Sequence, residues 1–130
     1  MRSAAKRFLL VATAFTLVGC GDDDPAGPVG QVGDNISWTQ DASNRRANIN
    51  QTYVYFCSPN GTFDTVWGTD VYTDDSSICT AAVHAGKITK AAGGTVTIEM
   101  RPAQDEYLGT TRNGVTSLDY GEWGGSFIVK

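Results

Sequence analysis

Apolar and polar residues alternate with a period of two along residues 94–100, which read GTVTIEM. Val96, Ile98 and Met100 fall on one face of such a segment, and the polar residues between them fall on the other. This pattern predicts a half-buried strand. The strand is expected to end at Pro102, which cannot donate a ladder hydrogen bond.

Five further short segments are rich in β-branched and aromatic residues, or alternate in polarity, and predict more strands. They are residues 52–57 (TYVYFC), 65–68 (TVWG), 107–111 (YLGTT), 115–118 (VTSL) and 125–129 (GSFIV). Residues 58–61 (SPNG) and the Asn113-Gly114 pair predict tight turns, because Asn and Gly tolerate positive φ. Trp38 and Trp67 are expected in the core.

Small and apolar residues dominate residues 76–85, where the pattern changes to that of a helix. At 100° per residue, they cover an arc of about 200°, which is wider than the apolar face of a surface helix. Most of them are Ala, so this helix is expected to be a central element enclosed by sheets. Asp74 or Asp75 is expected to cap its start, and Gly86 to end it. The predicted fold class is α+β.

The first 19 residues have the order of a targeting segment, with a basic start followed by 12 apolar or small residues, 8–19. That stretch is too short for a helix to cross a bilayer. Residues 17–20 (LVGC) resemble the bacterial lipobox, in which the cysteine, here Cys20, becomes the acylated first residue. The alternative is an ordinary secretory leader in which Cys20 lies at this place by chance. With two or more acyl chains, the lipid would anchor the protein stably.

Residues 20–33 are predicted to be the lipidated start and a flexible linker rich in Gly, Pro and Asp, so the folded domain is expected over residues 34–130. Without residues 1–19, seven Lys and Arg oppose 14 Asp and Glu, for a net charge of −7. This charge disfavours nucleic acid as a partner. The predicted location is the cell envelope, anchored by lipid, at the outer membrane or periplasmic face if the organism has two membranes.

The chain has three cysteines, and lipidation of Cys20 would leave two. In an exported, oxidising compartment, Cys57 and Cys79 are expected to form a disulfide, which would stabilise the fold by roughly 3 kcal/mol. The alternative is two separately buried thiols.

His84 is the only histidine of the chain and the first candidate for a catalytic or metal-binding role. On a helix, His84 and Cys79 point about 140° apart, and Ser77 lies two turns away, about 10.5 Å. Neither residue is placed to exchange a proton with His84. A single histidine without a spare thiolate is a poor metal site, and no pair of carboxylates has a favourable spacing. We therefore expect no enzyme activity, no metal and no cofactor, and a structural hydrogen bond for His84.

Three segments together resemble the LCCL domain: residues 66–86 (VWGTDVYTDDSSICTAAVHAG), 93–100 (GGTVTIEM) and 107–127 (YLGTTRNGVTSLDYGEWGGSF). The resemblance covers about residues 34–130. It implies an extracellular domain with a central α-helix, about 76–85, wrapped by short antiparallel strands in two sheets. It also implies a disulfide that involves the helix cysteine, Cys79. Ser58 and Gly61 depart from the animal pattern, which has Pro and a second Cys there.

The family occurs in an endotoxin-sensing protease and in secreted matrix proteins, which implies binding rather than catalysis. Two functions follow as hypotheses: a protein–protein or envelope accessory module, or alternatively a module that binds a glycan or lipopolysaccharide. Aromatic side chains near Gly-rich turns suit both partners. The candidate ligand surface consists of Tyr72, Arg112, Asn113, Tyr120 and Trp123.

Overall fold

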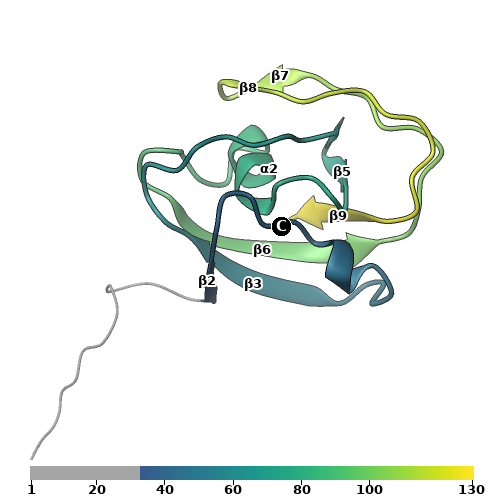
Figure 1. The fold of residues 1–130 in the computed structure, drawn as a ribbon, viewed down its shortest axis with the longest axis horizontal. Coiled ribbons are helices and arrows are strands. Elements are labelled where there is room, and N and C mark those ends of the chain that lie inside the picture. The colour runs from purple at the N-terminus through teal and green to yellow at the C-terminus, as the bar shows by residue number, and fades with distance from the viewer. Residues whose placement is uncertain (1–32) are drawn as a thin grey trace, which may run out of the picture. The chain divides into compact units, whose positions relative to one another are not determined.

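The computed structural model describes residues 33–130; the leader, Cys20 and the linker up to residue 32 lie outside the described residues. Within residues 33–130 the chain forms eight strands, one α-helix and one 3-10 helix (Figure 1). Their order is β2 (Asp34–Ile36), η3 (Ser43–Arg45), β3 (Thr52–Cys57), β4 (Gly68–Thr69), β5 (Val71–Thr73), α2 (Ile78–His84), β6 (Gly94–Arg101), β7 (Thr111–Arg112), β8 (Val115–Thr116) and β9 (Ser126–Val129).

Six of these strands form one sheet, in the order β2-β3-β6-β9-β5-β4, and β7 and β8 form a second, two-stranded sheet. The expectation of antiparallel pairing is wrong for β2 and β3, which run parallel, with Asp34 opposite Tyr55. The chain leaves β2, passes through η3 and enters β3 in the same direction. A parallel pair requires such a crossover instead of a hairpin. The other strand pairs are antiparallel.

The alternating segment forms β6 as predicted, between β3 and β9. Val96, Ile98 and Met100 are buried in the core, and the residues between them are more exposed. The strand ends at Arg101, directly before Pro102. The apolar face of this strand therefore shares one hydrophobic core with the helix.

Helix α2 is shorter than expected, yet each of its seven residues is buried. The expectation that Asp74 or Asp75 caps it is wrong: Ser77 is the N-cap, and its Oγ accepts a 3.1 Å hydrogen bond from the backbone N–H of Thr80. Gly86 ends the helix as expected, with a positive φ of 79°. The N–H groups of Gly86 and Lys87 donate to the carbonyls of Val83 and Ala82, which completes a Schellman motif.

A disulfide joins Cys57, at the end of β3, to Cys79, in the first turn of α2, and confirms the predicted pairing. Both cysteines are fully buried. Trp38 is also in the core, where its indole N–H donates to the carbonyl of Ser58 at 2.9 Å. The predicted turn follows Ser58, with Asn60 at a φ of 58°. Gly61 packs so closely on the Trp38 ring that a Cβ there would overlap it.

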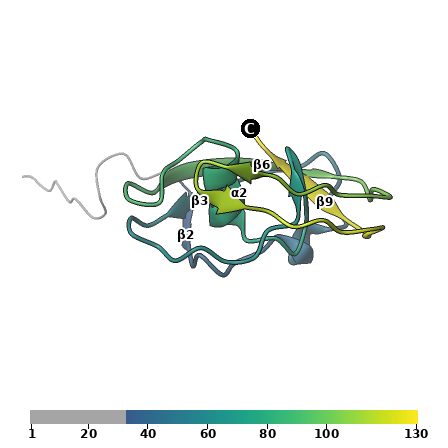
Figure 2. The same cartoon turned by 90° about the horizontal axis from the view of Figure 1, so that it is seen from above.

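The segment from Gln104 to Trp123 folds back on itself as a long hairpin. Bridges at Gln104–Trp123 and Tyr107–Tyr120, and the β7–β8 pair, share one register around the Asn113-Gly114 turn. Figure 2 shows the two arms side by side, and Figure 1 shows the tip above α2. The helix thus lies between the large sheet and the hairpin tip (Figure 1). The predicted wrapping by strands is matched only loosely, because much of the cover on this side is irregular chain.

Candidate functional site

The structure does not bring the five predicted ligand-surface residues together, and Tyr72 is a correction. Tyr72 has no exposed surface, because β5 directs it into the core under the hairpin. Its ring lies 5.8 Å from that of Phe127. Burial raises the pKa of Tyr72 to about 12. Tyr72 therefore belongs to the core and not to a ligand surface.

His84 is fully buried and bonded on both ring nitrogens. Its Nε2 lies 3.0 Å from the carbonyl oxygen of Thr110, an atom that only accepts, so Nε2 carries the proton. Nδ1 then accepts a 2.9 Å hydrogen bond from the hydroxyl of Tyr72. The expected structural hydrogen bond of His84 is thus observed, with partners on β5 and the hairpin. It ties the end of α2 to both.

The hairpin tip holds two of the predicted residues in local contacts. Arg112 donates to the exposed carboxylate of Asp70 at 2.8 Å. The side-chain amide of Asn113 donates to the carbonyl of His84 at 3.0 Å and so fixes the tip to the helix end. Tyr120 pairs with Tyr107 farther along the hairpin. It lies five residues from Val115 at the tip, which corresponds to roughly 16 Å along an extended strand. The tip and Tyr120 are therefore separate places.

Tyr120 and Trp123 do lie together, in a pocket of about 140 Å³ that we call the aromatic pocket. The Tyr120 ring lies 5.5 Å from Trp123 at 86°, and 6.3 Å from Trp67 at 70°. Trp67, expected in the core, is only half-buried and forms one wall. The lining is completed by Thr73 and Asp75.

An ion pair between a buried carboxylate and a partly exposed arginine holds the Trp123 wall in place. Asp74 is fully buried, and its carboxylate accepts two hydrogen bonds from Arg46, at 2.6 and 2.8 Å. It also accepts a 2.9 Å hydrogen bond from the indole N–H of Trp123. The guanidinium of Arg46 lies 5.3 Å from the Trp123 ring centre, on a face of the ring. The bond to Asp74 raises the pKa of Arg46, which stays charged.

Asp75 is the residue of this pocket whose role sequence reasoning missed. Its Oδ1 is buried, and within residues 33–130 it has no hydrogen-bond partner. A carboxylate oxygen can only accept, and burial without a donor is costly. The sequence did not reveal this unpartnered oxygen, because an Asp pair directly before a helix is usually interpreted as an N-terminal cap. Arg46 was missed as well, since it lies 28 residues from Asp74 in the chain.

Beside the aromatic pocket, the hairpin arms expose a set of large apolar side chains. Leu108 is 59% exposed, Leu118 is 47% exposed and Tyr120 is 44% exposed. Hydrogen bonds fix the backbone of the arms here: the N–H of Leu118 donates to the carbonyl of Val66, and the N–H of Gly109 donates to the Asp119 carboxylate. We call Leu108, Leu118 and Tyr120 the outer strip.

The sequence matches one known class of protein module. Residues 35–127 match the LCCL domain family, and the chain belongs to it. Human vitrin is 45% identical over 64 residues, 49% of this chain and 9% of vitrin. Human cysteine-rich secretory protein LCCL domain-containing 2 is 46% identical over 56 residues, 43% of this chain and 11% of that protein.

Clotting factor C of Tachypleus tridentatus is 43% identical over 56 residues, 43% of this chain and 5% of factor C. The matches therefore span about a tenth or less of these three relatives and concern a single module of each. Between residues 33 and 130, no helix is long and apolar enough to cross a membrane. In the same range, no group of three His, Cys, Asp or Glu side chains is placed to hold a metal ion.

Proposed function

We propose that this chain is a non-enzymatic LCCL module of the cell envelope, tethered by lipid, that binds a partner protein through the outer strip. The observation that carries the proposal is that the two paired arms of one hairpin expose three large apolar side chains, Leu108, Leu118 and Tyr120. Large apolar side chains exposed together mark interaction surfaces, whereas single ones do not.

The composition of the outer strip suits a protein partner. Tyr and Trp are enriched among the residues that dominate binding energies, and Tyr120 lies against Trp123. The backbone of the arms is held by bridges at Tyr107–Tyr120 and Trp67–Leu118. Because the strip is already ordered, a partner would lose little entropy in ordering it.

The tether is part of the proposal and rests on the sequence. Residues 1–19 would be the lipoprotein signal peptide, Cys20 the acylated residue, residues 20–33 the linker and residues 34–130 the binding module. The mature protein would then be exported and held at the membrane surface, at the outer membrane or periplasmic face of a two-membrane organism. A linker of 14 residues of low apolar content would keep the strip accessible.

A glycan or lipopolysaccharide is the second candidate ligand. The observation that favours it is the exposed ring of Tyr120, which offers a partly apolar face to a sugar. The net charge argues against an anionic lipid headgroup as the main attraction.

Site-specific photo-crosslinking in intact cells tests the proposal. A photoreactive amino acid at position 118 of the full-length chain should give one discrete cross-linked protein. The same amino acid at Val54, which is 38% exposed on β3, serves as the matched control. The product should disappear when Leu108→Asp is added. A product of equal yield at both positions, or none at position 118, would contradict a protein interface there.

A further inference from the structure

We infer that the aromatic pocket binds a protonated primary amine, the ammonium group of a lysine side chain that the partner protein presents. This inference deepens the proposed function and rests on it, because Tyr120 belongs to both the outer strip and the pocket. The chemistry of the walls is what defines the ligand, so the inference can be tested without the partner.

The unpartnered oxygen of Asp75 favours a ligand that donates a hydrogen bond. Asp75 lines the pocket, and its Oδ1 is buried and accepts no hydrogen bond from residues 33–130. An N–H group brought to it would form a charge-assisted bond, which is among the stronger protein hydrogen bonds. A quaternary ammonium group has no N–H to donate. The oxygen therefore favours a primary amine over a choline-like group.

The ring geometry favours a compact cation over a flat ligand. Tyr120 stands nearly perpendicular to Trp123, at 86°, and steeply to Trp67, at 70°. Walls that meet edge to face form a box, not the level platform on which a sugar ring would lie flat. Aromatic faces attract cations, and Trp is the strongest of the three ring types.

Size agrees with this ligand. At about 140 Å³, the pocket is smaller than the roughly 300–1,000 Å³ that enclose drug-sized ligands, and it suits the end of one side chain.

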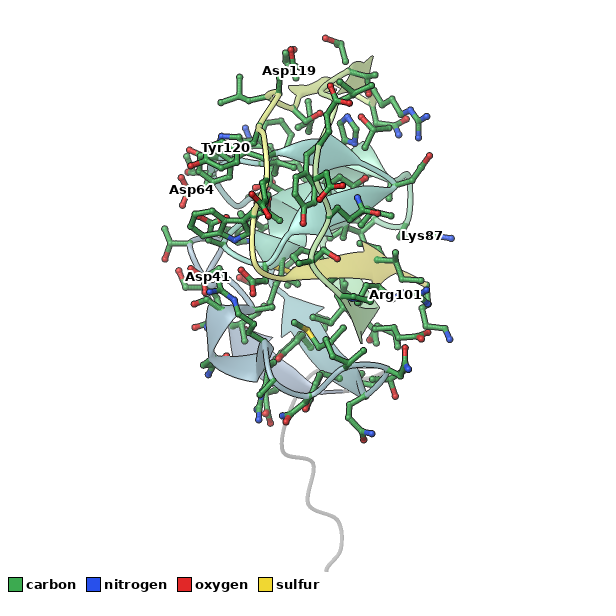
Figure 3. All side chains as sticks on the ribbon, turned by 90° about the vertical axis from the view of Figure 1, so that its right-hand side faces the viewer. Asp41, Asp64, Lys87, Arg101, Asp119 and Tyr120 are labelled. Atoms are coloured by element: carbon green, nitrogen blue, oxygen red, sulfur yellow. A yellow bond between two sulfur atoms is a disulfide. The ribbon has the colours of Figure 1, made fainter. Side chains whose placement is uncertain are left out.

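The local charge is also suited to a cation. In Figure 3, Tyr120 lies on the same side of the molecule as Asp41 and Asp64, whereas Lys87 and Arg101 lie on the other side. The nearest basic group, Arg46, is paired to Asp74 by two hydrogen bonds, so its charge is largely compensated. The carboxylates of Asp41, Asp64 and Asp75 would all attract an arriving ammonium group.

The test uses small probes and the indole N–H signals of the three tryptophans in NMR spectra of the full chain. Nα-acetyl-lysine methylamide is titrated into the protein, and its norleucine analogue, which has a similar side chain without the amine, is titrated in a parallel experiment. The lysine probe should shift the signals of Trp67 and Trp123 in a saturable way, and leave Trp38 in the core unchanged. We expect it to bind at least about tenfold more tightly than the norleucine probe.

Variants assign the effect to the carboxylate. Asp75→Asn should weaken the lysine probe about tenfold, because it removes the charge and keeps the shape. Glu122→Gln removes the same charge from an exposed position next to Trp123 and should change binding less than about twofold. If Asp75→Asn does not fold, Tyr120→Leu removes a wall of the box and should weaken the probe in the same way.

Several outcomes would overturn the inference. These are the absence of saturable shifts, equal affinity for the norleucine probe, choline binding as tightly as the lysine probe, or a methyl glucoside binding where lysine does not. The last result would support the glycan candidate. A lysine probe that binds without a cross-link at position 118 would contradict the proposed function alone. A cross-link without probe binding would contradict this inference alone.

Discussion

The indole N–H of Trp123 donates a 2.9 Å hydrogen bond to Oδ1 of Asp74, a carboxylate with no exposed surface. The same carboxylate receives the two hydrogen bonds of Arg46. One buried acid thus joins the segment after β5, the segment after η3 and the segment before β9. The position of the aromatic wall depends on this link.

Replacing Asp74 by Ala is expected to lower the free energy of unfolding by about 2–4 kcal/mol, because Arg46 and the Trp123 N–H lose their acceptor. The cost is less than for a wholly buried pair, since the Arg46 side chain is 44% exposed. Urea unfolding followed by fluorescence measures the change. As a control, Arg112→Ala removes the exposed ion pair with Asp70 and should cost less than about 1 kcal/mol. Equal costs would contradict this role of Asp74.

Gly125→Ala is expected to destabilise the fold by about 1–3 kcal/mol. A Cβ at this position would overlap Oδ2 of Asp74 and lie 2.9 Å from Arg46. Gly121→Ala is the matched control, because no atom lies within 4 Å of a Cβ there. Thermal unfolding of the two variants compares them directly. A midpoint for Gly125→Ala no lower than that for Gly121→Ala would show that Gly125 is not constrained by the ion pair.

Removing the disulfide by the double substitution Cys57→Ala and Cys79→Ala is expected to cost about 3 kcal/mol. The bond closes a loop between residues 22 apart and restricts the unfolded chain. Two small cavities in the core add to the cost, since both side chains are fully buried. For the wild type, chemical denaturation with and without a reductant measures the free energy of unfolding without and with the disulfide. A loss below about 1 kcal/mol would contradict the stabilising role.

Tyr72 is expected to make the fold sensitive to alkali. Burial raises its pKa in the folded state from 10.0 to about 12, so the unfolded chain loses this proton first. The contribution of Tyr72 is therefore complete below about pH 10 and is lost as the pH rises toward 12. Tyr72→Phe should reduce the slope of stability against pH in this range.

The same substitution leaves Nδ1 of His84 without its donor. It should therefore cost about 1–2 kcal/mol at neutral pH. Unfolding curves at several values of pH measure both effects. A Phe variant with the wild-type slope would contradict the assignment to Tyr72.

Local patterns predicted the elements whose side chains or turns carry their own signal. Period-two alternation identified β6, Asn113-Gly114 identified the hairpin turn, and the count of cysteines identified the disulfide. The apolar arc of the helix explains why all of α2 is buried. The family was recognisable from the segment around this helix.

Relations between distant segments were not predictable in the same way. The parallel pairing of β2 depends on a crossover, and no local pattern encodes its direction. Tyr72 was assigned to the ligand surface because it is an aromatic residue near a Gly-rich turn, but it is buried and its hydroxyl donates to His84, 12 residues away. Asp75 and the tryptophans meet only through tertiary packing, so the aromatic pocket had no signal in the sequence.

Hydroxyl-radical footprinting in the intact envelope shows whether the outer strip is covered where the protein acts. We expect Leu108, Leu118 and Tyr120 to react several-fold less in the envelope than in the purified protein. Ile49 and Val54, each 38% exposed, should react equally in both and serve as internal controls. Equal labelling of the strip in both settings would contradict its role as a protein interface.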